Sequence, residues 1–116
     1  MYTITAQNAE IPAIGFGTWR LRGPECRDAV ANALETGYRH VDTAAHYDNH
    51  EAVGAGIDDA AVDRDDLFVT TKVPGFALGA ADLRETVQRN LDELGLSYVD
   101  LLLIHWPDDA VPIEET

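Results

Sequence analysis

Short apolar runs alternate along the chain with longer stretches in which apolar residues recur every three or four positions. The short runs are bounded by glycine, proline or polar residues, which predicts four β-strands at residues 13–17, 40–42, 67–72 and 99–105. The longer stretches predict three helices between those strands. Their apolar faces carry Val30, Ala33 and Leu34 in the first helix, Val53, Ile57 and Ala60 or Ala61 in the second, and Leu83, Val87, Leu91 and Leu94 in the third, which is about fifteen residues long.

Local signals make some of these predictions more specific. The first helix is expected to begin at Gly23-Pro24-Glu25 and to end before Gly37. The run at residues 99–105 is continuously apolar, as is typical of a parallel strand covered on both faces. The acidic tail at residues 108–116 predicts a loop.

Two short segments precede this pattern. Residues 2–4 and 10–12, separated by polar residues, predict a small β-hairpin that need not belong to the main sheet. The order of the other elements, β-α-β-α-β-α-β with short connections, predicts a parallel sheet with right-handed crossovers. No Gly-x-Gly-x-x-Gly loop follows the first strand, which favours a (β/α) barrel over a doubly wound sheet. A complete barrel takes roughly 250 residues. We therefore expect residues 1–116 to be a single α/β domain that forms at most half of a (β/α)8 TIM barrel.

Acidic residues dominate the charged surface. The chain has 21 aspartates and glutamates against 8 lysines and arginines, and its formal net charge is −13. This balance argues against a nucleic-acid or anionic-membrane partner, because both require basic patches. It is typical of halophilic proteins, in which salt screens the self-repulsion of the chain. Lys72 is the only lysine, so we expect it to have a chemical role.

Other features of the composition concern the compartment. No apolar run approaches the roughly 18 residues that a membrane-spanning helix needs, and the polar start lacks the order of a signal peptide. The single Cys26 cannot form an intrachain disulfide or a cysteine-based metal site. We expect a cytoplasmic protein.

Four ionisable residues lie at or just beyond the carboxyl ends of successive predicted strands. Asp42 ends the second strand and Tyr47 follows it, Lys72 ends the third and His105 ends the fourth. Barrel enzymes place their active sites at this end of the strands. We therefore expect these four side chains to lie near one another.

The chemistry that these groups favour is proton donation. A phenol is a weak acid at neutral pH, and a neighbouring ammonium strengthens it by stabilising the phenolate. Lys72 supplies such a charge, and Asp42 would hold it in place. A neutral His105 would form a hydrogen bond to a substrate oxygen. Such a site suits a carbonyl oxygen that gains negative charge as hydride reaches its carbon, with Tyr47 as general acid.

Other histidines allow alternatives. His46 and His50 are four residues apart, with Asp42 and Asp48 nearby, which is compatible with a metal pair on a helix face. Residues 47–49 look more like the loop and cap before the second helix, so the two histidines need not share a face, and we expect no metal site. His40, within the second strand, is expected to be structural.

Four segments carry a resemblance to a known family. They are residues 15–19 (Gly-Phe-Gly-Thr-Trp), residues 37–47 with Asn49, Val53 and Gly54, residues 70–72 and residues 103–107. In these segments and their spacing, the chain resembles the amino-terminal part of an aldo-keto reductase over essentially its whole length. The resemblance implies an oxidoreductase that transfers hydride from NADP(H) to a small aldehyde or ketone, with Tyr47, Lys72, Asp42 and His105 as its catalytic residues. It also implies cofactor contacts from Gly17, Thr18, Trp19 and Asp42, and substrate contacts from Trp19, His105 and Trp106.

The chain departs from the family pattern in three ways. His50 stands where the family signature usually has an acid, and Pro74 stands where many members have an aromatic residue beside the catalytic lysine. The strands that carry most of the remaining cofactor contacts in the family are absent from the sequence. An alternative is therefore an inactive half-barrel whose open sheet edges pair with a second copy or with a separate carboxy-terminal half.

Overall fold

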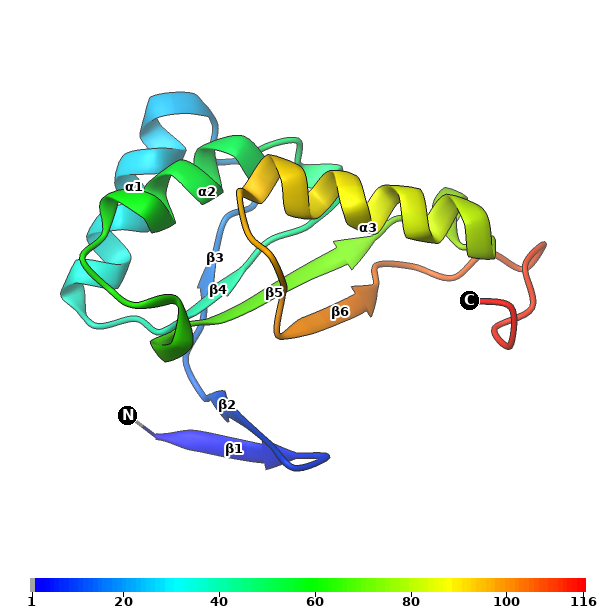
Figure 1. Cartoon of the computed structure of the whole chain (residues 1–116), viewed down its shortest axis with the longest axis horizontal. Coiled ribbons are helices and arrows are strands. Elements are labelled where there is room, and N and C mark those ends of the chain that lie inside the picture. Colours follow the sequence, from blue (N-terminus) through cyan, green and yellow to red (C-terminus); the bar gives the residue numbers. More distant parts are fainter. Residues whose placement is uncertain (1) are drawn as a thin grey trace.

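A computed structural model describes residues 2–116, which form a parallel sheet with three helices on one side of it (Figure 1). The sheet contains β3 (Phe16–Gly17), β4 (His40–Asp42), β5 (Phe68–Val73) and β6 (Leu101–Ile104), in that order, and all neighbours are parallel. The helices are α1 (Gly23–Thr36), α2 (His50–Asp59) and α3 (Ala80–Leu94). The predicted order of four strands and three helices is confirmed, although β3 and β6 are shorter than expected.

The amino-terminal hairpin forms a separate two-stranded sheet. Strands β1 (Thr3–Ala6) and β2 (Ala9–Pro12) pair antiparallel, and Figure 1 shows them apart from the main sheet. The two turn residues, Gln7 and Asn8, both have positive φ, which matches the twist of a tight hairpin. The hairpin prediction is therefore confirmed.

Helix boundaries follow the local signals. Pro24 lies in the first turn of α1, where its missing N–H costs nothing. Gly37 ends the helix with φ at +124°, a conformation that other residues rarely adopt. The chain is thereby turned directly into β4, which carries the first of the candidate site residues.

The main core lies between the helices and the sheet. Val30 and Leu34 of α1, Val53 of α2, and Val41 and Val69 of the strands are all fully buried. Ile57 and Ala60 are also buried, as the predicted faces of the first two helices require, whereas Ala61 is exposed.

The apolar face of α3 is only partly buried. Leu94 is buried, but Leu83, Val87 and Leu91 are only half-buried. The polar side chains of Thr86 and Asn90 are less exposed than these three apolar residues. Within residues 2–116, α3 packs beside α2 and over β5, and no further helix covers its other side. The predicted apolar stripe is therefore present but incompletely covered.

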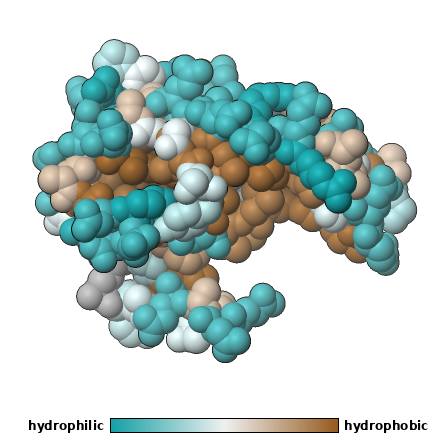
Figure 2. All heavy atoms as spheres, viewed as in Figure 1, coloured by the Kyte–Doolittle hydropathy of each residue, from teal (hydrophilic) through white to brown (hydrophobic). Residues whose placement is uncertain are grey.

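Strand β6 is an open edge of the sheet. It pairs with β5 alone, and Leu102, Leu103 and Ile104 are 39%, 41% and 38% exposed. The expectation of a strand covered on both faces is wrong for the described residues, because Leu102 and Leu103, which alternate between the two faces, are both exposed. Figure 2 shows apolar atoms gathered over the strands, between the polar surfaces of the helices and the hairpin.

The tail beyond β6 has no regular secondary structure, as predicted, but it is anchored. Val111 packs against the buried cluster of Val73, Ala77 and Leu78, and the Thr116 hydroxyl donates a hydrogen bond to the Leu78 carbonyl. Among the described residues, no helix is both long enough and apolar enough to cross a membrane.

Gly54 provides a test of how closely the helices pack. A Cβ at this position of α2 would collide with the backbone carbonyl of Leu94 in α3. We expect Gly54→Ala to lower the free energy of unfolding by roughly 1–3 kcal/mol, because backbone atoms cannot move aside as a flexible side chain can. Chemical denaturation measures this change.

Gly17→Ala is the matched control. A Cβ at Gly17 would meet no atom within 4 Å, so this variant should unfold at nearly the same denaturant concentration as the wild type. Equal midpoints for the Gly54 and Gly17 variants would contradict the predicted close approach of α2 and α3.

Candidate active site

The structure brings the four candidate residues to the carboxyl end of the sheet. Asp42 is the last residue of β4, and Tyr47 ends the 3₁₀ turn Ala45–Tyr47 (η1) that follows. Lys72 is the penultimate residue of β5. His105 lies one residue beyond β6, where its backbone N–H donates to the Val73 carbonyl at 2.8 Å.

Strand register explains why Asp42 and Lys72 meet. Asp42 lies opposite Thr70 in the parallel pairing of β4 with β5. Side chains alternate along a strand, so Asp42, Thr70 and Lys72 project from the same face of the sheet. The intervening Val41, Val69 and Thr71 face the helices and are buried. Two strand segments 30 residues apart are thus enough to create the pair.

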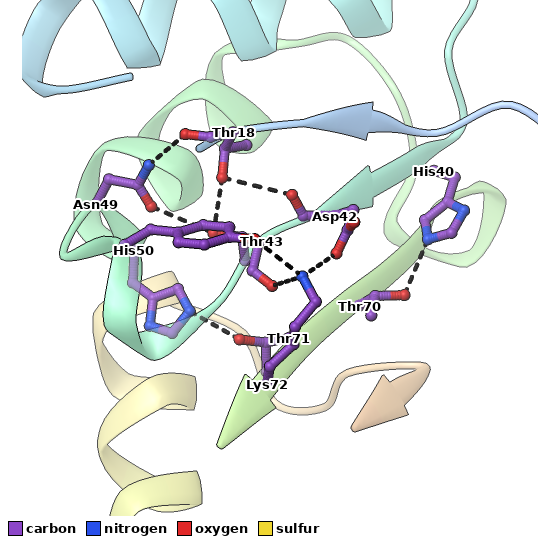
Figure 3. A network of polar contacts seen from close by, with 10 residues as sticks. Thr18, His40, Asp42, Thr43, Asn49, His50, Thr70, Thr71 and Lys72 are labelled. Carbon is purple, nitrogen blue, oxygen red and sulfur yellow. Dashed lines mark hydrogen bonds and ion pairs between the residues drawn. The ribbon is translucent and has the colours of Figure 1, made fainter. Parts of the chain in front are cut away.

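Lys72 is the centre of the site. Its Nζ donates to Asp42 Oδ1 at 2.6 Å and to the Thr43 carbonyl at 3.0 Å, and it lies 3.3 Å from the Tyr47 hydroxyl (Figure 3 labels all but the last). The Lys72 side chain is only 14% exposed, whereas that of Asp42 is 43% exposed. A partly enclosed ammonium is therefore held by a carboxylate and a carbonyl, with the phenol oxygen as its third neighbour.

His105 belongs to an aromatic group beside this ion pair. Its ring centroid lies 5.6 Å from Tyr47, 4.9 Å from Trp106 and 6.4 Å from His46. Burial lowers the pKa of His105, and the nearby charges of Lys72 and His46 lower it further, while Asp42 acts in the opposite direction. The ring is therefore neutral near pH 7. Its Nδ1 is enclosed without a partner among the described residues, which leaves Nε2 as the accessible nitrogen.

The end of β3 and the loop that follows it carry three candidate residues, which differ in their exposure to solvent. Gly17 is exposed, with open space where a side chain would be, and Trp19 is 64% exposed beneath the Arg20 guanidinium at 4.4 Å. Thr18 is fully buried, and its hydroxyl donates to Thr43 Oγ1 at 2.9 Å. In this structure Thr18 offers no side-chain contact to an external molecule, so any such contact at this loop falls to Gly17 and Trp19.

Trp106 contributes to the wall near His105. It is 36% exposed, lies edge-on to His46 at 5.1 Å, and approaches Phe76 at 6.2 Å. Pro74 is buried, so it offers no exposed aromatic surface. Phe76, two residues further along and 72% exposed, supplies an aromatic ring in that region.

Buried polar residues beneath the site were not predicted from the sequence. Asn49 occupies the N-cap position of α2, as expected, but its side chain does not cap the helix. Its amide donates to the carbonyls of Thr18 and Leu21, and its oxygen accepts from Thr43. Hydroxyl and amide residues beside the candidate residues were the available signal, although their partners are distant in sequence.

The other histidines have separate structural partners. His40 contacts Thr70 Oγ1 at 2.9 Å and the Pro12 carbonyl at 3.4 Å, which confirms its structural role. Both ring nitrogens of His50 are bonded, to Glu93 and Thr71, whereas His46 faces Trp106. Residues 2–116 contain no group of three or more histidine, cysteine or acidic side chains placed to hold a metal ion.

Comparison with known proteins identifies relatives of this arrangement. The family described as "Aldo/keto reductase family" matches residues 13–116. The 2,5-diketo-D-gluconic acid reductase B of Corynebacterium sp. (strain SHS752001) is 44% identical over 97 residues, which are 84% of this chain and 35% of that protein. The chain thus spans about a third of the length of this curated relative.

Solved structures agree with this match. An aldo/keto reductase from Brucella melitensis superposes with a TM-score of 0.92 at 38% identity, covering 98% of this chain and 45% of that one. A Bombyx mori aldo-keto reductase in complex with NADP gives 0.84 at 37% identity, covering 93% and 41%. These neighbours are TIM barrels, so the predicted partial barrel is confirmed.

The ion pair of the site makes a prediction about Lys72. Asp42→Asn removes the carboxylate that binds the Lys72 ammonium, so the released amine should react faster with N-hydroxysuccinimide acetate. A partly buried pair worth about 1 kcal/mol corresponds to roughly a fivefold change. Because Lys72 is the only lysine, mass spectrometry with peptide mapping separates its acetylation from that of the terminal amine.

Asp48→Asn is the control for this experiment. It makes the same charge change in the neighbouring loop, at an exposed residue with positive φ that asparagine tolerates. Equal reaction rates in the two variants would contradict the assigned role of Asp42.

The buried His50 allows a prediction of how the stability of the fold depends on pH. Burial lowers the pKa of His50 from its ordinary 6.5, so the folded state binds fewer protons than the unfolded state. This contribution to stability is complete above pH 6.5 and is lost as the pH falls below it. We expect His50→Gln to flatten that decline by at most about 1.4 kcal/mol per pH unit, measured by denaturation. Parallel curves for wild type and variant would refute this assignment.

Proposed function

The chain belongs to the aldo/keto reductase family, and from this premise we propose that it forms the catalytic, amino-terminal part of an NADPH-dependent reductase of small aldehydes or ketones. The observation that carries the proposal is the contact of Lys72 Nζ with both Asp42 and the Tyr47 hydroxyl. The family match and the oxidoreductase names of the relatives support the same reaction class.

The residues around Gly17 fit a nicotinamide cofactor. Gly17 leaves an uncovered backbone beside the end of β4, and Trp19 presents an exposed aromatic ring on the same loop. A flat ring can approach such a surface closely because no side chain stands in the way. When bound, NADPH supplies the hydride. Gly17, Trp19 and Asp42 would hold its nicotinamide end, and Thr18 would support the loop from inside.

Tyr47 is the proton donor in this proposal. As the carbonyl carbon gains a hydride, its oxygen gains negative charge and takes the proton from the Tyr47 hydroxyl, which leaves an alcohol and a phenolate. Lys72, 3.3 Å away, stabilises that phenolate by its positive charge. Asp42 holds the ammonium in place beside the phenol. The proton returns to Tyr47 from solvent after the product leaves.

His105 would orient the carbonyl group. Its lowered pKa keeps the ring neutral, and a protonated accessible nitrogen donates a hydrogen bond to the carbonyl oxygen beside Tyr47. Trp19 and Trp106 would form walls of the substrate pocket, and Phe76 widens the aromatic surface that Pro74 does not provide. A small carbonyl compound fits this group, and the relative's diketo acid is one candidate class.

A second candidate function follows from the exposed sheet edge. Leu102, Leu103 and Ile104 are each about two-fifths exposed on β6, whose outer edge has no partner in the described residues (Figure 1). Such an edge favours pairing with another strand. In this reading, residues 1–116 turn over substrate only when a second copy or a separate carboxy-terminal half covers that edge.

The catalytic assignment predicts the effect of one hydroxyl. Tyr47→Phe keeps the ring against His105 but removes the proton donor, so kcat should fall by about 10²–10⁴-fold with little change in KM. NADPH absorbance in high salt, with a series of small aldehydes, measures both constants. Retained turnover in Tyr47→Phe would exclude this residue as the general acid.

The same preparation separates the two candidates. Turnover by a species of 12.7 kDa, measured by size-exclusion chromatography with light scattering, favours the chain as an enzyme by itself. Absence of turnover from that species, together with turnover by a larger assembly, favours the second candidate.

A further inference from the structure

His50 lies where three elements meet. It is the first residue of α2, and its side chain is 1% exposed. Its Nε2 is 2.9 Å from Thr71 Oγ1 on β5, as Figure 3 shows, and its Nδ1 is 3.2 Å from Glu93 Oε2 on α3. One imidazole therefore joins the start of α2 to a strand and to a second helix.

The partners determine where the proton on the ring lies. A carboxylate only accepts hydrogen bonds, so Nδ1 carries the ring proton and donates a hydrogen bond to Glu93. In the neutral ring, Nε2 then accepts from the Thr71 hydroxyl. Burial lowers the pKa of His50, while the bond to Glu93 opposes this effect in part. The ring thus acts as one donor and one acceptor in a fixed orientation.

The bond between His50 and Thr71 joins the two segments that carry Tyr47 and Lys72. Thr71 immediately precedes Lys72 on β5, and its side chain faces the helices because side chains alternate along the strand. His50 follows Tyr47 by three residues, and Asn49 between them is itself bonded to Thr18 and Thr43. A shift of α2 relative to β5 would therefore move Tyr47 relative to Lys72.

The distance between those two groups leaves little room for such a shift. Tyr47 OH and Lys72 Nζ are 3.3 Å apart, near the long limit for a hydrogen bond. Displacement by a few tenths of an ångström would separate them and weaken the stabilisation of the phenolate.

We propose that His50 is a positioning residue, which sets the distance between Tyr47 and Lys72 by bonding Thr71 and Glu93 at once. The proposal deepens the carbonyl-reductase function and rests on it. It also accounts for the histidine at a position where the family signature usually has an acid: a carboxylate at residue 50 would face that of Glu93, and two neighbouring carboxylates repel each other.

Three variants test the link. His50→Gln retains one donor and one acceptor, His50→Leu retains neither, and Thr71→Val removes the hydroxyl with almost no change of shape. All are measured at a temperature where denaturation curves show each variant to be folded. If His50→Leu does not fold, Thr71→Val tests the same bond by itself.

The expected result is a graded change at the catalytic pair. We expect kcat to fall about tenfold or more in His50→Leu and Thr71→Val, with KM changed less than about threefold. His50→Gln should retain most of the wild-type kcat. Acetylation of Lys72 by N-hydroxysuccinimide acetate should accelerate by about threefold in the same two variants but not in His50→Gln.

The lysine measurement separates this proposal from the proposed function. If neither the wild type nor any variant turns over substrate, but the reactivity of Lys72 changes as expected, the reductase function fails while the positioning role stands. If Lys72 reactivity and kcat are the same in wild type, His50→Leu and Thr71→Val, His50 is only a structural residue and the proposal is overturned. Unaltered Lys72 reactivity in the folded Thr71→Val variant alone has the same consequence.

Discussion

The ion pair between Lys72 and Asp42 is the interaction on which the site depends, because it pairs a partly enclosed charge with a carboxylate and fixes the ammonium beside the Tyr47 hydroxyl. The pairing of β4 with β5 builds it directly, since parallel register places Asp42 beside Thr70 and strand alternation brings Lys72 to the same face. Tyr47 then needs only a single 3₁₀ turn after β4 to bring its hydroxyl to the pair. The geometry of the candidate site is therefore a property of the sheet rather than of long loops.

Strand β5 serves the site and the core together. On one face, Thr70 and Lys72 carry polar groups toward His40 and Asp42. On the other, Val69 and Val73 are buried in the apolar core, and Thr71 interrupts that core with a hydroxyl that bonds His50. Buried polar groups are costly unless they are paired, so this contact ties α2 to the strand that holds the lysine. The helix layer and the site are mechanically connected through this residue.

The two sides of the molecule differ in completeness. The carboxyl end of the strands already holds all four of the predicted catalytic residues close together. Strand β6 and the outer side of α3, by contrast, leave Leu102, Leu103 and Leu91 partly exposed. In the two solved relatives the matched segment is less than half of the chain. The candidate site is thus assembled within residues 2–116, whereas the sheet edge and the outer side of α3 are left partly uncovered.

The sequence by itself determined the order of elements, the helix boundaries at Pro24 and Gly37, and the carboxyl ends of the strands to within one residue, because periodicity and backbone preferences are local. It also located Asp42, Tyr47, Lys72 and His105. Only the tertiary structure decided that Thr18 is buried, that Asn49 and His50 bond across the fold, and that β6 is an exposed edge. The bonds of His50 join residues 21 and 43 positions apart, and those of Asn49 to Thr18 and Leu21 span 31 and 28 positions. No local pattern specifies pairings at such separations.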